Sequence, residues 1–121
     1  MEKGTEGDAD MNKYNAKKIS LGGQTFDSKR EFDRWCELSL LQRGKVISEL
    51  QRQVKFELIP NQYDEDGKLV ERAVNYIADF TYYDKALGKT IVEDAKGMKT
   101  KEYIIKRKLM LHVHGIKIKE V

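Results

Sequence analysis

The chain comprises 121 residues, of which 36% are charged and 40% hydrophobic, and its formal net charge is +3. This length and balance suit one compact domain with a modest core rather than two domains or a disordered chain. No apolar run approaches the ~20 residues that a membrane-spanning helix needs, and residues 1–10 contain no apolar stretch, so we expect no secretory signal. The single cysteine, Cys36, cannot form an internal disulfide, which favours a cytoplasmic location.

The charges are unevenly distributed along the chain. Residues 61–94 carry eight acids and four bases, whereas residues 95–121 carry eight bases and two acids. Residues 11–30 are also basic, with five bases and one acid. Acids that hold a cation beside bases that hold phosphates are typical of a metal-dependent enzyme acting on a polyanion. A solvated surface of mixed sign is the alternative interpretation.

The N-terminal region shows little hydrophobic periodicity. Residues 1–12 are predicted to be a disordered tail, followed by a single domain over residues 13–121. The basic stretch that opens this domain is predicted to be an extended segment with a Gly-Gly turn. Its candidate phosphate contacts are Lys13, Lys17 and Lys18, although lysines in a solvated segment would look the same.

A helix is predicted over Lys29–Gln42, ended by Gly44. Ser28, or Asp27, is the expected N-cap, and Glu31 completes a capping-box pattern with Ser28. The stripe expected to face the core consists of Phe32, Trp35, Leu38 and Leu41. Glu31 shares a face with part of this stripe, so it is either a capping residue or an acid directed at the sheet.

Strands are predicted after this helix. A short strand is expected over Val46–Leu50, and a second one follows from the alternation of Val54, Phe56 and Leu58. The dipeptide Asp66-Gly67 marks a hairpin turn, after which one long strand is predicted over Leu69–Tyr83.

The most informative stretch is Tyr76–Gly97, which predicts two strands around a tight turn. Asp79 lies in the middle of the first strand, where a buried carboxylate without a partner would be costly. In the second strand, side-chain alternation places Asp94 and Lys96 on one face and Glu93 on the other. The spacing D-x(14)-D-x-K fits the (D/E)-x-K nuclease pattern, with a cross-strand salt bridge as the alternative.

These residue types suit the hydrolysis of a phosphodiester. Mg²⁺ or Mn²⁺ prefers one or two carboxylates with water and substrate oxygens in the other positions. Asp79 and Asp94 are the expected metal ligands, joined by the backbone carbonyl of Ala95 and, directly or through water, by Glu31. Lys96 is expected to orient the attacking water and to offset negative charge in the transition state.

A second helix is predicted over Lys101–His114, with Thr100 as its N-cap and Gly115 at its end. Residues 116–121 alternate as a last strand. The candidate phosphate contacts in this region are Lys99, Lys106 and Lys108. The order of helix, three or four strands, helix and strand predicts an α/β fold around a central mixed sheet.

The segments KYNAKK, FDSKREFDRW, YIADFTYYD and IVEDAKGMKTKEYIIKRKL resemble a small group of phage and prophage proteins. These proteins are described as a domain of unknown function and are assigned to the PD-(D/E)xK nuclease superfamily. The resemblance covers residues 13–121 and implies a restriction-endonuclease-like core, α-β-β-β-α-β, in which helices flank the mixed sheet. It carries the superfamily's first acid onto Glu31, its metal-binding aspartate onto Asp79, and its (D/E)-x-K pair onto Asp94 and Lys96.

From the residues and the resemblance together we expect a Mg²⁺-dependent DNA endonuclease, phage-encoded and acting in the cytoplasm of a bacterial host. A chain this small leaves little room for a target-recognition domain, so branched or structured DNA is the expected substrate. Cutting both strands would favour a homodimer. The alternative is a non-catalytic nucleic-acid-binding domain that retains the nuclease fold.

Overall fold

The computed structural model describes residues 18–21, 23–95 and 98–121. In chain order its elements are β1 (Ile19–Leu21), β2 (Gln24–Phe26), α1 (Lys29–Arg43), β3 (Ile47–Ile59), β4 (Gln62–Tyr63), β5 (Leu69–Glu71), β6 (Val74–Asp84), β7 (Lys89–Asp94), α2 (Lys101–His114) and β8 (Lys119–Glu120). The predicted tail over residues 1–12 lies outside the described residues, as do Lys13, Lys17 and Lys96.

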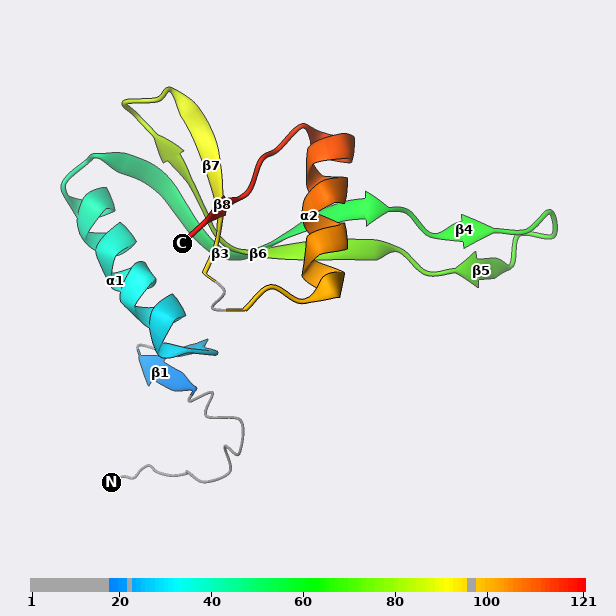
Figure 1. Cartoon of the computed structure of the whole chain (residues 1–121), viewed down its shortest axis with the longest axis horizontal. Helices are drawn as coiled ribbons and strands as arrows, with labels where there is room; N and C mark the ends of the chain where they lie inside the picture. Colours follow the sequence, from blue (N-terminus) through cyan, green and yellow to red (C-terminus); the bar gives the residue numbers. More distant parts are fainter. Residues whose placement is uncertain (1–17, 22, 96–97) are drawn as a thin grey trace.

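The centre of the fold is a four-stranded sheet with the strand order β3-β6-β7-β8 (Figure 1). The first three strands are antiparallel neighbours, whereas β8 pairs parallel with β7 after the crossover through α2. Strands β1 and β2 form a separate two-stranded sheet, and so do β4 and β5. The prediction of a mixed α/β fold with a central mixed sheet and two helices is therefore confirmed.

Helix α1 begins and ends close to where its capping residues predict. The Glu31 backbone N–H donates to the Ser28 hydroxyl at 3.1 Å, and the Gly44 N–H donates to the Leu40 carbonyl at 2.9 Å. Leu38 is completely buried, but Leu41 is 37% exposed, so its predicted place in the core is wrong. The reason is that α1 contributes Trp35 and Leu38 to its core cluster, and Leu41 lies at the margin of that narrow stripe.

The predicted strand boundaries differ from the structure in two places. The two strands expected after Gly44 are one 13-residue strand, β3. Glu49 and Gln53 in this strand have positive φ angles of 58° and 53°, and the pairing register shifts between Ser48 and Gln51. These irregularities interrupt the alternation of side chains, which explains why the sequence predicts two strands where the structure has one. The predicted long strand over Leu69–Tyr83 is instead divided into β5 and β6.

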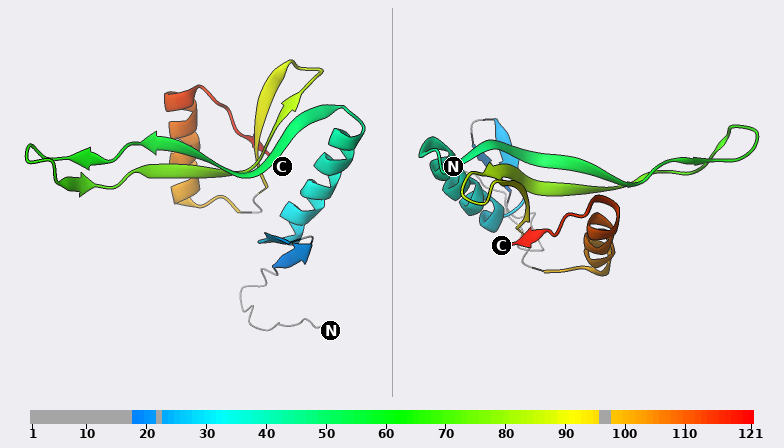
Figure 2. Two further views of the ribbon diagram at one scale, coloured as in Figure 1. Left: turned by 180° about the vertical axis from the view of Figure 1, so that it is seen from behind. Right: turned by 90° about the horizontal axis from the view of Figure 1, so that it is seen from above.

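Both helices cover one face of β6. The alternate residues of this strand that share the face are all buried, and they are Tyr76, Ala78, Phe80 and Tyr82. The first two belong to a core cluster with Tyr103 and Met110 of α2, whereas the last two cluster with Leu38 of α1. The helices thus lie towards opposite ends of the long β3–β6 hairpin, as the two views in Figure 2 show.

Helix α2 has the bounds that its sequence predicts. The Tyr103 N–H donates to the Thr100 hydroxyl at 3.1 Å, and Gly115 ends the helix in the left-handed region with a φ of 67°. The last strand is shorter than expected, because only Lys119 and Glu120 pair with β7. In the described part of the chain no helix is long and apolar enough to cross a membrane.

Strands β4 and β5 extend the β3–β6 hairpin away from both helices (Figures 1 and 2). We call this extension, residues 61–72, the arm. All of its residues are exposed. The Asp64 carboxylate accepts the backbone N–H groups of Asp66 and Lys68 at 2.9 and 3.0 Å, which fixes the turn at its tip. At the arm's base, the Asn61 side-chain carbonyl accepts the Ala73 N–H at 2.6 Å.

Candidate metal and nucleic-acid site

A pocket of about 300 Å³ lies where the N-terminus of α1 meets β6 and the segment between β7 and α2. Its lining residues are Asp27, Ser28, Glu31, Asp79, Ala95, Met98 and Thr100. The structure therefore brings together three of the residues that the sequence singles out, Glu31, Asp79 and Ala95. They come from three segments that are far apart in the chain. We call this feature the acid pocket.

Asp79 lies on β6 and is half-buried at the acid pocket. One of its carboxylate oxygens accepts the backbone N–H of Ala95 at 2.7 Å. This bond offsets part of the cost of placing a carboxylate in the middle of a strand. It also ties β6 to the point where the chain leaves β7, so it fixes the Ala95 backbone beside the Asp79 carboxylate.

Asp94 is 1% exposed and is not among the residues that line the acid pocket. Phe80 pairs with Glu93, and extending this register by one residue sets Asp79 opposite Asp94. The Tyr76 hydroxyl donates to the Asp94 carboxylate at 2.7 Å. Burial and this negatively charged acceptor raise the pKa of the Tyr76 phenol far above its ordinary value, so the phenol stays a proton donor.

Glu31 is 3% exposed and its carboxylate is held by three donors. One oxygen accepts the Asp27 backbone N–H at 3.1 Å, and the other accepts the Arg52 guanidinium at 3.2 Å and the Gln53 amide at 3.0 Å. Glu31 thus holds the backbone just before the helix, through Asp27 and not through the N-cap Ser28 as in a regular capping box, and it also lines the acid pocket.

Arg52 and Gln53 reach the same carboxylate although they are consecutive residues of β3. In a regular strand their side chains would point to opposite faces of the sheet. The positive φ of Gln53 interrupts this alternation. The Arg52 guanidinium also lies 3.9 Å from the centre of the Phe26 ring, which holds it over the N-terminal end of α1.

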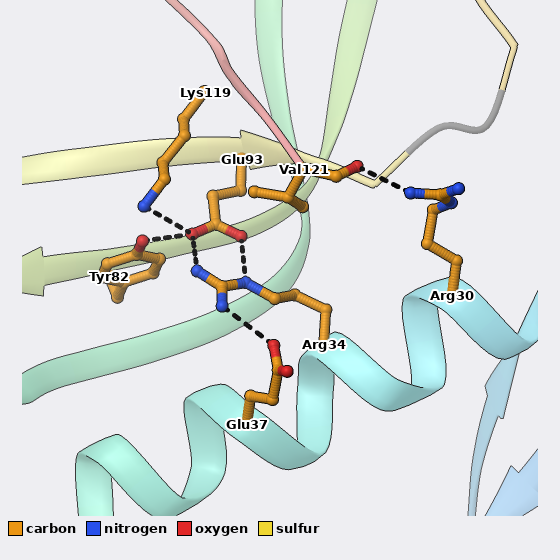
Figure 3. A network of polar contacts seen from close by, with 7 residues as sticks. All are labelled: Arg30, Arg34, Glu37, Tyr82, Glu93, Lys119 and Val121. Atoms are coloured by element: carbon orange, nitrogen blue, oxygen red, sulfur yellow. Dashed lines mark hydrogen bonds and ion pairs between the residues drawn. The ribbon is translucent and has the colours of Figure 1, made fainter.

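Glu93, the neighbour of Asp94, belongs to a different network (Figure 3). Its two carboxylate oxygens accept from Arg34 Nε at 2.8 Å and Nη2 at 2.6 Å, and the Tyr82 hydroxyl donates to one of them. Lys119 Nζ lies 3.9 Å away. Burial, followed by the contact with Glu93, raises the pKa of the Tyr82 phenol. This bidentate pair joins α1 to β7 on the side opposite Asp94.

Sequence reasoning did not find Arg34 or Tyr76 as polar partners in this region. A signal was available for the first of them. Alternation turns Glu93 towards the core, and a buried acid needs a cationic partner. Arg34 lies one helical turn after Glu31 on α1, so it was a reasonable candidate for that partner. No comparable pattern in the sequence pairs Tyr76 with Asp94.

Of the predicted phosphate-binding lysines that the structure describes, two are engaged in ion pairs within the protein. Lys99 pairs with Glu120 at 3.0 Å, and Lys106 pairs with Glu102 at 3.0 Å. Lys18 and Lys108 are exposed. Lys13, Lys17 and Lys96 belong to the part of the chain that the structure does not describe.

The acid pocket offers oxygen donors, which suit a hard cation such as Mg²⁺. Among the described residues, however, no group of three or more His, Cys, Asp and Glu side chains is arranged to hold a metal. Of the expected ligands, Glu31, Asp79 and Ala95 line the pocket, whereas Asp94 does not. The carboxylates of Glu31 and Asp79 are donors of the type that Mg²⁺ takes.

Fold and site define a small mixed α/β protein with acidic residues gathered beside one sheet. The chain belongs to the family described as "Protein of unknown function (DUF1064)", whose model matches residues 11–120. No curated protein and no solved structure matches the chain.

Proposed function

We propose that this protein is a metal-dependent endodeoxyribonuclease with a restriction-endonuclease-like core. The observation that carries the proposal is the acid pocket, at which Glu31, Asp79 and Ala95 meet from three distant segments. The order of the central elements, helix, three sheet strands, helix and strand, also agrees with such a core. The likeness to phage and prophage proteins of the PD-(D/E)xK superfamily adds support from the sequence.

In this proposal Asp79, Asp94 and the Ala95 carbonyl hold Mg²⁺ or Mn²⁺, and Glu31 reaches the ion directly or through water. The bound ion supplies charge neutralisation and a water of lowered pKa. The chain's own residues orient these ligands: the Ala95 N–H fixes the Asp79 carboxylate, and the Tyr76 hydroxyl fixes Asp94. We assign to Lys96, which lies outside the described residues, the role of orienting the attacking water.

The proposed substrate is DNA, with branched or structured DNA preferred because the chain has little room for a target-recognition domain. Lys18 and Lys108 are exposed and available for phosphate contacts, and Lys13, Lys17, Lys99 and Lys106 complete the proposed set. A homodimer would place two sites on one duplex. The proposed setting is the cytoplasm of a bacterial host that carries a phage.

A second candidate function is a non-catalytic nucleic-acid-binding domain with the same fold. One observation favours it: both oxygens of Glu31 already accept from protein donors, including the Arg52 guanidinium. A cation at Glu31 would have to share this carboxylate with a fixed positive charge. This domain would bind DNA in a salt-dependent way and would not respond to Mg²⁺ or Mn²⁺.

The deciding experiment is cleavage of plasmid and branched DNA with Mg²⁺ or Mn²⁺. We expect Asp79→Asn and Lys96→Ala each to lower the cleavage rate by at least about a hundredfold. The matched control is Asp33→Asn, because Asp33 is an exposed acid on α1 that contacts only the Lys29 side chain among the described ion pairs. Undiminished cleavage by the Asp79 or Lys96 variant would refute the assigned mechanism.

Calorimetric titration separates the two candidate functions. The nuclease should bind Mn²⁺ in the absence of DNA, and Asp79→Asn should weaken this binding at least about tenfold. Salt-dependent DNA binding without any heat of metal binding would support the non-catalytic domain instead.

A further inference from the structure

The arm exposes apolar side chains that the fold itself does not cover. Tyr63 is 59% exposed, Leu69 is 44% exposed and Val70 is 57% exposed. Tyr63 and Leu69 are paired across the two strands, so their side chains share one face. A two-stranded hairpin without a packed face is marginally stable in water, which points to a surface that another molecule covers.

The charge of the arm argues against nucleic acid as that molecule. Residues 61–72 carry four acids and two bases. The tip itself places Asp64, Glu65 and Asp66 in consecutive positions. Phosphates would be repelled by these carboxylates, whereas a basic protein surface would attract them.

A surface that carries exposed lysines lies beside the base of the arm, on α2. A groove of about 600 Å³ separates α2 from the start of β6, and it is lined by Ala73, Val74, Asn75, Glu102, Ile105 and Lys106. Ile105 is 59% exposed. Lys101 and Lys108, four residues before and three after it, are exposed on the same helical face. Residues 101–114 carry four bases, not counting histidines, and one acid.

We propose that the arm of one copy seats in this groove of a second copy, and that two copies exchange arms about a two-fold axis. Because the groove lies at the base of the copy's own arm, two antiparallel arms can each reach the other's groove, which closes the assembly as a dimer. The apolar residues of the arm cover Ile105, and its acidic tip lies against the lysines of α2. This inference does not depend on DNA hydrolysis, although it places Lys108, one of the proposed phosphate contacts, against the acidic tip of the second copy.

The test is the molar mass of the full chain in solution, measured by light scattering and sedimentation over a wide concentration range. We expect a species of twice the 14.1 kDa chain mass. The double variant Tyr63→Ser, Leu69→Ser should weaken dimerisation by about tenfold or more, because exposed apolar area on their shared face of the arm is lost. Leu87→Ser is the matched control, since Leu87 is 63% exposed but lies in the β6–β7 turn.

A pair of charge-reversed variants tests the exchange of arms directly. The first carries Glu65→Lys and Asp66→Lys at the tip, and the second carries Lys101→Glu and Lys108→Glu on α2. Each alone should be monomeric at concentrations at which the wild type dimerises, because like charges face each other. Mixed together they should form a dimer, since both contacts again join opposite charges.

Thermal denaturation of every variant tests whether the exposed substitutions leave the fold intact. A wild-type chain that stays monomeric throughout would overturn the proposal. So would a dimer that the arm substitutions leave unchanged, or charge-reversed variants that fail to associate when mixed.

Discussion

Arg34 and Glu93 illustrate how burial changes the effect on stability of removing one partner of an ion pair. The Glu93 side chain is fully buried and that of Arg34 is 19% exposed. Arg34→Met removes the bidentate partner of the buried Glu93 carboxylate and leaves it the more distant Lys119, so we expect a loss of about 3 kcal/mol in the free energy of unfolding. Lys29→Met removes a surface pair with side chains 79% and 54% exposed, and its effect on stability should be much smaller. Urea denaturation measures both.

The double variant Arg34→Met, Glu93→Leu tests whether the lost stability comes from the carboxylate that the single variant leaves behind. Replacing both charges with apolar side chains removes the buried carboxylate, so much of the lost stability should return. Equal losses for Arg34→Met and Lys29→Met would show that the pair contributes no more than a surface contact.

Glu120 gives a prediction about acid stability. The Tyr103 hydroxyl, Lys99 and Arg107 all contact its carboxylate and lower its pKa from the ordinary 4.5 to about 2. A lowered pKa in the folded state means that the stabilisation is complete above pH 4.5 and is lost as the pH falls towards 2. Thermal denaturation of Glu120→Gln should therefore depend less on pH in this range than that of the wild type. Parallel curves for the two proteins would contradict the assignment.

At the level of elements, the two helices end in different ways. Gly115 ends α2 with a φ of 67°, whereas Gly44 ends α1 with a φ of −79°. An L-residue in the left-handed region costs roughly 1–2 kcal/mol, so Gly115→Ala should destabilise the protein by about that amount. Gly44→Ala needs no such conformation, and its Cβ would meet the Leu40 carbonyl oxygen at an acceptable 3.4 Å. Its effect should be within about 0.5 kcal/mol of zero or stabilising. Chemical denaturation compares the two, and equal effects would remove the conformational explanation.

The presence or absence of local sequence signals explains which elements the sequence predicts well. Helix α2 is bounded by a capping threonine and a terminal glycine, both local signals, and its range matches the structure. The range of strand β3 does not match its prediction, because its positive φ angles fall on Glu49 and Gln53 instead of on glycine. Residues of this kind give no local sign that the alternation is about to be interrupted.

In the candidate site, too, some features follow from local sequence signals and others do not. Strand alternation separates Glu93 from Asp94 without knowledge of the fold, because it depends only on neighbouring positions. The meeting of Glu31 with Asp79 depends on how α1 packs against the sheet, and the contact between Tyr76 and Asp94 depends on how β6 and the end of β7 come together. Such contacts join residues distant in sequence and leave no periodic pattern.

At the scale of the whole molecule, the proposed DNA binding predicts how its salt dependence changes when an exposed lysine is removed. Each lysine that neutralises a phosphate adds about 0.9 to the slope of log affinity against log salt concentration. Lys18→Ala should therefore lower this slope by about 0.9 and weaken binding to all sequences alike. Lys85 is an exposed lysine of the β6–β7 turn, and Lys85→Ala should leave the slope unchanged. Fluorescence anisotropy at several salt concentrations gives both values, and identical slopes for the wild type and Lys18→Ala would remove this residue from the interface.

The bidentate contact between Arg34 and Glu93 also selects the correct alignment of β7 during folding. A slip of β7 by one residue would turn every side chain to the other face of the sheet and would present Asp94 to Arg34. Aspartate is one methylene shorter than glutamate, so it reaches the guanidinium fork less well across the same gap. The two adjacent acids are therefore not equivalent to the folding chain, and the misaligned sheet lacks the contact that stabilises the correct one.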